Sequence, residues 1–229
     1  MTNGSMRVFL GYDSKEPIAF HVAMHSIFIR ASVPVSVTPL VQAALRSGGI
    51  YTRERGSTES TEFSLTRFLC PFLSGYDGYS LFLDCDILFL TDVVELLAYG
   101  LAYPDKAVFV VQHDYKPKTD QKFLGQAQTS YPRKNWSSVM LFNNSRCRAL
   151  TPKYINSATG LELHRFMWIK DEEIGSLPLE FNHLVGEYET ATNAKILHYT
   201  LGTPCFPEYA NCDNSKEWWA ERDAMLGVK

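Results

Sequence analysis

The sequence predicts an α/β fold with a mostly parallel central sheet, and its first forty residues carry that prediction. Arg7–Leu10 is a short apolar run typical of a buried strand, and Val35–Leu40 is expected to be the next strand. Between them, Pro17 opens an apolar helical pattern that continues to about Ala31, as proline does in a first helical turn. Strand, helix and strand in this order indicate a parallel pair joined by a crossover helix. Such sheets bind ligands beyond the carboxyl ends of their strands, which places Gly11–Asp13 at the expected rim.

Length and composition are those of one folded domain. The chain has 229 residues, of which 45% are hydrophobic and 21% charged, so a single domain over residues 1–229 is expected. Residues 1–5 are small and polar, and we interpret them as a tag remnant or a disordered start. The five cysteines form no Cys-x-x-Cys pair, which argues against a zinc site and against a disulfide framework.

Charge and hydropathy exclude two classes of partner. The formal net charge of -3 at pH 7 provides no basic footprint for nucleic acid. No apolar run approaches the roughly 20 residues that a transmembrane helix needs, and no secretory signal is visible. Together with reduced cysteines, this predicts a cytoplasmic location.

Two carboxylates stand one residue apart inside a strongly apolar stretch. Asp84 and Asp86 lie between Leu81–Leu83, an expected buried strand, and Ile87–Leu90, an expected second apolar element. Burying two like charges without a partner is costly, so this placement points to a bound cation. Oxygen ligands suit a hard divalent ion such as Mn²⁺ or Mg²⁺. The alternative is a charged turn with both acids in solvent, because Asp-x-Asp is a common pattern.

The segment before this strand places a charge among apolar residues. Glu62–Leu73 reads as a helix that Pro71 kinks or breaks. Arg67 lies among its apolar residues and therefore needs an anion. This anion is either the carboxylate of a structural salt bridge or a ligand, in which case Arg67 contacts a phosphate or a sugar.

The remaining elements complete an alternating pattern. We expect a short helix at Thr91–Leu97 with Thr91 or Asp92 as its N-cap, strands at Ala107–Val111, Ser137–Asn143 and Lys195–Gly202, and a closing helix around Trp218-Trp219. The long polar segment from His113 to Trp136 is a candidate lid or acceptor loop, and it contains the aromatic residues Tyr131 and Trp136. His198 falls near the end of the last strand, where a lone histidine is either structural or a ligand. Neither a dinucleotide-binding nor a P-loop glycine motif is present.

Several of these segments, in this order, resemble the nucleotide-sugar glycosyltransferases of the GT-A fold. The similarity is greatest to family eight, which contains glycogenin and bacterial lipooligosaccharide galactosyltransferases. It extends from Val8 to about Phe206 and is strongest in Thr66–Phe68 with Leu81–Asp86, in Ser138–Asn143 and in His198–Pro204. The resemblance implies a Rossmann-like, three-layer architecture with a mostly parallel mixed central sheet.

The resemblance also implies an activity and a set of site residues. It implies transfer of a hexose from a nucleotide-diphosphate sugar, with a UDP-sugar favoured, to a glycan or other hydroxyl acceptor, with retention of configuration. Mn²⁺ or Mg²⁺ would be held by Asp84, Asp86 and His198. Arg67 would meet the donor's sugar or diphosphate, and Asp171 and Glu172 would read the transferred sugar. The donor nucleotide would be contacted by Gly11, Tyr12, Asp13, Arg67, Asp84 and Gly202.

Departures from the family pattern leave the substrate open. Trp136 and Ser138 stand where the family has asparagine and glycine, Glu172 stands for a glutamine, and Thr203 precedes Pro204 where a lysine is usual. An inverting enzyme would need a general base, for which Asp171 or Glu172 is the candidate.

Two other classes of function remain open from the sequence. A nucleotidyltransferase or sugar-phosphate enzyme would be expected to carry a glycine-rich, basic loop after the first strand, and Gly11–Glu16 is not such a loop. A non-catalytic sugar-nucleotide-binding module predicts no metal-dependent nucleotide binding.

Overall fold

A mixed six-stranded sheet forms the centre of the molecule. The computed structural model describes residues 5–56, 59–118, 121–122, 125–127, 132–189 and 193–228. The sheet order within these ranges is β2 (Val35–Leu40), β1 (Met6–Gly11), β3 (Tyr79–Leu83), β8 (Val139–Asn143), β5 (Val108–Val111) and β9 (Ile174–Leu177). β8 pairs antiparallel with both of its neighbours, whereas the other pairs are parallel. The α/β fold with a mostly parallel mixed sheet is therefore confirmed.

The first crossover follows the expected pattern. α1 (Pro17–Phe28) begins at the proline and joins β1 to β2, and β1 also pairs parallel with β3. The carboxyl ends of β1, β3 and β5 therefore meet at one edge of the sheet, and β8 starts at that same edge. This edge is where the ligand site is expected.

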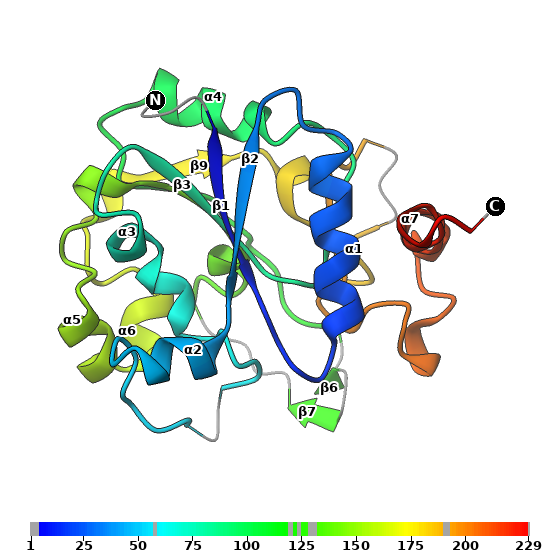
Figure 1. The fold of residues 1–229 in the computed structure, drawn as a ribbon, viewed down its shortest axis with the longest axis horizontal. Coiled ribbons are helices and arrows are strands. Elements are labelled where there is room, and N and C mark those ends of the chain that lie inside the picture. The colour runs from blue at the N-terminus through cyan, green and yellow to red at the C-terminus, as the bar shows by residue number, and fades with distance from the viewer. Residues whose placement is uncertain are drawn as a thin grey trace.

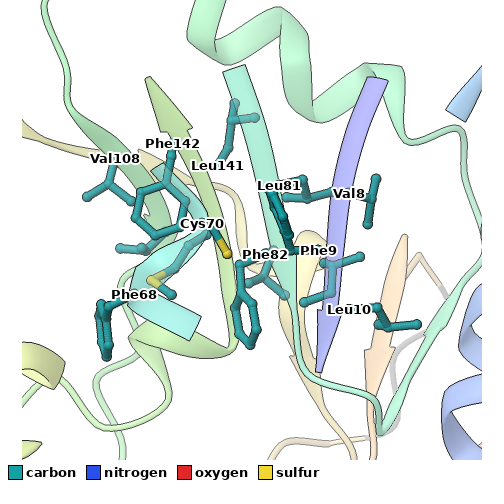
Figure 2. Close-up of a cluster of buried hydrophobic side chains, with 14 of the residues drawn as sticks. Val8, Phe9, Leu10, Phe68, Cys70, Leu81, Phe82, Val108, Leu141 and Phe142 are labelled. Carbon is teal, nitrogen blue, oxygen red and sulfur yellow. The ribbon is translucent and has the colours of Figure 1, made fainter. Parts of the chain in front are cut away.

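Large apolar side chains fill the space around the central strands. Figure 2 shows the cluster, to which β1 contributes Val8–Leu10, β3 contributes Leu81 and Phe82, and β8 contributes Leu141 and Phe142. Because these strands are buried on both faces, they read as continuous apolar runs rather than as alternating patterns.

Short helices surround the sheet. In the view of Figure 1, α1 and α7 lie to the right of β1 and β2, whereas α3, α5 and α6 lie to the left. The bounds are α2 (Gln42–Ser47), α3 (Cys70–Leu73), α4 (Val94–Ala102), α5 (Pro152–Ser157), α6 (Gly160–His164) and α7 (Ser215–Leu226). Among the described residues, no helix is long and apolar enough to cross a membrane.

Two smaller sheets accompany the central one. β10 (His183–Leu184), β11 (Ile196–His198) and β4 (Ile87–Phe89) form a three-stranded sheet in that order, and β6 (Gln121–Lys122) pairs with β7 (Gln126–Ala127). β11 runs antiparallel to β4, so that His198 is the partner of Ile87. This pairing brings the end of the late strand beside the residue that follows Asp86.

Several local expectations were wrong in detail. The strand expected at Lys195–Gly202 is limited to β11, Ile196–His198. The expected helix Glu62–Leu73 is a 3₁₀ helix at Thr66–Leu69 followed by α3, because Pro71 occupies the first turn of a new helix. The expected helix at Thr91–Leu97 begins later, at Val94, whose amide donates to Oδ1 of Asp92 at 3.0 Å. The candidate lid His113–Trp136 lies partly outside the described residues, and Tyr131 lies wholly outside them.

Candidate metal and substrate site

Backbone hydrogen bonds fix both acids of the Asp-x-Asp turn. Asp84 and Asp86 occupy the short connection between β3 and β4. The amide of Asp84 donates to the carbonyl of Ser138 at 2.9 Å, and the amide of Tyr199 donates to the carbonyl of Asp86 at 2.8 Å. Each acid is therefore anchored to a different neighbouring segment.

The three residues expected to bind metal come together at this turn. Asp84, Asp86 and His198 each offer one ligand atom, and these atoms lie within 4.8 Å of one another. Nε2 of His198 is 3.3 Å from Oδ1 of Asp86, and the histidine is only 2% exposed. Two carboxylates and an imidazole are a donor set suited to a divalent cation such as Mn²⁺.

Arg67 reaches the same cluster from the 3₁₀ helix. Its Nη1 lies 2.8 Å from Oδ1 of Asp84 and also donates to the carbonyl of Ser137 at 2.9 Å. Its guanidinium packs over the rings of Phe63 and Phe82, and the residue is buried. The salt bridge expected as one alternative is therefore present, and its partner is a residue of the candidate metal cluster.

A cavity of about 600 Å³ opens onto the cluster. Its wall comes from described residues between Arg53 and Arg67, the Asp-x-Asp turn, the residues before β8, the α6 region and the end of β11. The cationic side chains on this wall are Arg53, Arg67, Lys134 and Arg165, and the imidazole rings of His164 and His198 also line it. A concave site that combines carboxylates, cations and hydroxyl groups fits a polar, anionic ligand bound together with a cation.

Two of the residues expected at the nucleoside make contacts within the protein. Asp13 is fully buried, and its two carboxylate oxygens accept hydrogen bonds from the amides of Lys15 at 3.0 Å and Glu62 at 3.1 Å. Tyr12 packs edge-to-face on Phe20. Gly11 is the last residue of β1, and Tyr12 and Asp13 follow it. None of the three is among the described residues that line the cavity.

Gly202 occupies a backbone conformation that favours glycine. Its φ is 153°, it is buried, and its amide donates to the carbonyl of Tyr199 at 2.8 Å. It lies four residues after His198 and outside the cavity wall as far as the structure describes it.

Asp171 and Glu172 do not reach the cavity wall in the described part of the chain. They form a 3₁₀ turn just before β9, whose first residue Ile174 pairs with Val108 at the amino end of β5. Both are exposed, and Asp171 makes an ion pair with Arg133 at 2.7 Å. Their expected contact with the sugar stays a prediction.

A buried acid beside the cluster escaped the sequence analysis. Glu16 is 3% exposed, and burial, followed by the charges of Asp86 and Asp13, raises its pKa well above the ordinary value. The thiol of Cys85 donates to its Oε1 at 3.6 Å. An acid just before Pro17 has the pattern of an ordinary helix start, so its burial cannot be recognised from the residue pattern.

The sequence analysis did not anticipate that Asn182 contacts His198 or that Ser138 in turn contacts Asn182. Nδ1 of His198 lies 2.9 Å from Oδ1 of Asn182, and Nδ2 of Asn182 donates to Oγ of Ser138 at 2.8 Å. Residues that orient a ligating histidine through its second nitrogen are a regular part of metal sites. An isolated asparagine carries no sequence signal of this role.

Comparisons with known proteins agree with this geometry. No model of a known protein family matches the chain. Protein CDI of Arabidopsis thaliana is 46% identical over 224 residues, which cover 95% of this chain and 86% of that protein. The description of this relative names no activity.

Solved structures of glycosyltransferases share the fold. The bifunctional glycosyltransferase WbbM matches with a TM-score of 0.68 and 15% identity over 97% of this chain, which spans 50% of the WbbM chain. The galactosyltransferase LgtC, solved with donor and acceptor sugar analogues, matches with a TM-score of 0.62 and 11% identity over 98% of both chains. GlyE of Streptococcus pneumoniae matches with a TM-score of 0.60 and 16% identity over 98% of this chain and 63% of that one.

These likenesses confirm the expected architecture. LgtC is a member of glycosyltransferase family eight, the family that the sequence motifs resemble. At identities below one fifth, the likeness shows the fold and not the substrate. The chain belongs to the family of Protein CDI and has the GT-A glycosyltransferase fold.

Proposed function

We propose that the chain is a metal-dependent glycosyltransferase that moves a hexose from a nucleotide-diphosphate sugar, preferably a UDP-sugar, to a hydroxyl group of a glycan or another acceptor. The observation that carries the proposal is the cluster of Asp84, Asp86 and His198 at the wall of a 600 Å³ cavity in a GT-A fold. Mn²⁺ or Mg²⁺ is the expected cofactor because two of the three ligands are carboxylates.

The chemistry of the site follows from charge. Departure of a nucleoside diphosphate develops negative charge on its phosphates, and a divalent ion bound at the cluster would stabilise that charge as a Lewis acid. Arg67 acts from inside the protein, where its ion pair with Asp84 holds that carboxylate in place. Thr200 on the cavity wall offers a hydroxyl group to a sugar or phosphate, whereas the hydroxyl group of Ser138 is engaged with Asn135 and Asn182.

The stereochemical outcome is proposed to be retention. Within the described wall, the carboxylates are Asp84, Asp86 and Glu59. The first two belong to the metal cluster, and Oε1 of Glu59 accepts from the amide of Gly56 at 2.7 Å. This arrangement supports retention because an inverting enzyme needs an available general base opposite the leaving group. Observed inversion would make Glu59 the first residue to replace.

The remaining roles are proposals that rest on the sequence resemblance. Gly11, Tyr12, Asp13 and Gly202 are proposed to contact the nucleotide, and Asp171 and Glu172 to read the sugar. Asp171→Asn and Glu172→Gln separate these roles from the metal site. They are expected to change the choice among UDP-sugars while leaving the affinity for UDP with Mn²⁺ unchanged.

Calorimetry with UDP tests the metal-dependent site directly. UDP is expected to bind in the presence of Mn²⁺ and to lose that affinity when the metal is chelated. Asp86→Ala is expected to abolish the Mn²⁺-dependent part while the protein remains folded. Asp105→Ala, which removes an exposed acid far from the cluster in sequence, is the matched control. An unchanged affinity for UDP in Asp86→Ala would contradict the assignment of the site.

Product analysis distinguishes the three classes of function. Incubation with a panel of UDP-sugars is expected to release UDP and free sugar slowly, since donor hydrolysis needs no acceptor. Release of UMP and a sugar phosphate would instead indicate nucleotidyl chemistry. Binding of UDP-sugars without turnover and without a metal requirement would indicate a binding module.

A further inference from the structure

We propose that Asn135, Ser138 and Asn182 form a hydrogen-bonded relay that keeps the ring proton of His198 on Nδ1 and presents the lone pair of Nε2 to Asp84 and Asp86. The inference rests on the proposed metal-dependent function and assigns positioning residues to its metal site. The relay is internal, since Ser138 and His198 are each 2% exposed and Asn182 is 0% exposed.

The relay starts at a carbonyl group, which can only accept. Asn135 adopts a left-handed backbone conformation, with φ of 61° and ψ of 7°, which asparagine tolerates better than most residues. Its carbonyl oxygen accepts hydrogen bonds from Oγ of Ser138 at 2.8 Å and from Nδ2 of Asn182 at 3.4 Å. The hydroxyl proton of Ser138 is therefore directed at Asn135.

The next step fixes the orientation of the Asn182 amide. Because Ser138 uses its proton on the carbonyl, its oxygen is left as an acceptor for the Asn182 amide group 2.8 Å away. The hydroxyl oxygen of Ser138 and the carbonyl oxygen of Asn135 can each accept a hydrogen bond from the Asn182 amide. The NH₂ end of Asn182 therefore faces them, and its Oδ1 points the other way.

The last step sets the tautomer of the histidine. Oδ1 of Asn182 lies 2.9 Å from Nδ1 of His198, and an amide oxygen can only accept. The proton of a neutral ring is thus held on Nδ1, which leaves the lone pair on Nε2. Nε2 is 3.3 Å from Oδ1 of Asp86. In the neutral ring with its proton on Nδ1 both of these atoms are acceptors, and a cation bound by both would satisfy the contact.

The relay gives a function to a departure from the family pattern. Ser138 stands where the family that the chain resembles has glycine, so its hydroxyl group is a feature of this chain. Asn135 and Ser138 also line the cavity beside Asp84 and Asp86. The same two residues therefore contact the substrate space and orient a metal ligand through Asn182.

Nuclear magnetic resonance of the metal-free protein determines the tautomer of His198 without any activity assay. With ¹⁵N-labelled histidine at a pH of about 8.5, where an ordinary histidine is neutral, the long-range ring correlations of His198 are expected to show the proton on Nδ1. Loss of its signals in His198→Gln assigns the resonance. In Asn182→Ala the proton is expected to shift wholly or partly to Nε2. A proton on Nε2 in the wild-type protein overturns the relay.

Affinity for Mn²⁺, measured by electron paramagnetic resonance in the presence of UDP, tests the consequence. Asn182→Ala is expected to weaken Mn²⁺ binding about 10- to 100-fold, the usual effect of removing such a partner. Asn182→Asp retains an acceptor for Nδ1 and is expected to recover most of the affinity. Ser138→Ala is expected to cause a smaller loss, because the carbonyl of Asn135 still orients the amide.

Asn144→Ala is the matched control for these variants. Asn144 is fully buried, accepts from Oγ of Ser80 at 2.7 Å and donates to the carbonyl of Asp77 at 2.9 Å, at the other end of β3 and β8. The variant Asn144→Ala is expected to lower the free energy of unfolding, as Asn182→Ala does, but to leave the affinity for Mn²⁺ unchanged. Equal Mn²⁺ affinities in wild type and Asn182→Ala would overturn the relay. Failure of the wild-type protein to bind Mn²⁺ would instead overturn the proposed function, and the tautomer measurement would then decide on the relay alone.

Discussion

Nη1 of Arg67 lies 2.8 Å from Oδ1 of Asp84, so one carboxylate of the candidate metal cluster already has an internal counter-charge. The pair is largely shielded from water, with side-chain exposures of 7% for Arg67 and 15% for Asp84. The carboxylates of Asp84 and Asp86 therefore do not repel each other with full strength before a metal binds. A bound divalent cation would turn the cluster net positive, which is the charge that a diphosphate requires.

Replacement of Arg67 is expected to make folding depend on metal. Arg67→Met removes the counter-charge and leaves Asp84 beside Asp86, which is expected to lower the free energy of unfolding by about 3 kcal/mol. Saturating Mn²⁺ is expected to recover a larger part of the stability in this variant than it adds to the wild type. Urea denaturation with and without Mn²⁺ measures both effects. An equal gain from Mn²⁺ in the two proteins would contradict this account.

Gly11 is expected to be required for packing rather than for backbone flexibility. A Cβ atom at this position would lie 2.6 Å from the ring of Phe63, a buried residue next to the cavity. Gly11→Ala is therefore expected to cost about 1 to 3 kcal/mol of stability through overpacking. Combining it with Phe63→Leu should recover part of that loss in a double-mutant cycle. Additive losses in the double variant would show that the two residues do not compete for the same space.

Glu221 is expected to anchor the last helix to α1. Its side chain is 4% exposed and contacts Nδ1 of His25 at 2.6 Å and Nη2 of Arg30 at 2.8 Å. Glu221→Gln is expected to lower the free energy of unfolding by about 2 kcal/mol, because both contacts lose a charged acceptor. Thermal or urea denaturation measures the effect. Glu95→Gln, which breaks the more exposed pair with Lys195, is the control and should cost less than about 1 kcal/mol.

Acid is expected to destabilise the protein through His113. Burial, followed by the charges of His198 and His183, lowers the pKa of His113 from 6.5 to about 3. Above pH 6.5 the residue is neutral in both states, and its full contribution to stability is present. As the pH falls from there towards 3, the unfolded chain binds a proton that the folded protein does not.

The size of this effect is set by one proton. The free energy of unfolding should fall by about 1.4 kcal/mol per pH unit from this histidine once the pH is well below 6.5. His113→Asn keeps a polar partner for the hydroxyl of Tyr188 but cannot titrate. Urea denaturation across the acid range should show a shallower slope in the variant, and identical slopes would exclude His113 as the source.

The strands and the metal cluster were predictable because apolar runs and charged exceptions are visible in the sequence. Asp84 and Asp86 interrupt a buried stretch, and the resemblance added His198 at a strand end. Asn182 and Ser138 were not predictable as a pair, since their role depends on a contact across 44 positions in the chain. Glu16 escaped for the same reason, because its burial results from packing against the Asp-x-Asp turn.

The positions of Asp171 and Glu172, which were expected to contact the sugar, are difficult to predict from the sequence. They depend on the path of the short segment that precedes β9. Asp171 matches the family in residue type, whereas Glu172 replaces its glutamine, and the chain enters β9 within three residues of Asp171. The single helix expected at Glu62–Leu73 was wrong, since Pro71 starts a new turn rather than kinking an existing one. Local residue patterns define the type of an element better than they define where the next element begins.

The antiparallel pairing of β4 with β11 determines which parts of the cavity wall can change in sequence without moving the Asp84, Asp86 and His198 cluster. The ladder that places His198 opposite Ile87 ties two ligand-bearing segments together through their backbones. The separation of the ligands is thereby set before any ion arrives, and little conformational entropy is lost on loading. The described cavity-wall residues between Arg53 and Leu65 and between Thr159 and Arg165 lie outside this ladder. Under the proposed function, acceptor preference can therefore change at these residues while the geometry of the Asp84, Asp86 and His198 cluster is kept.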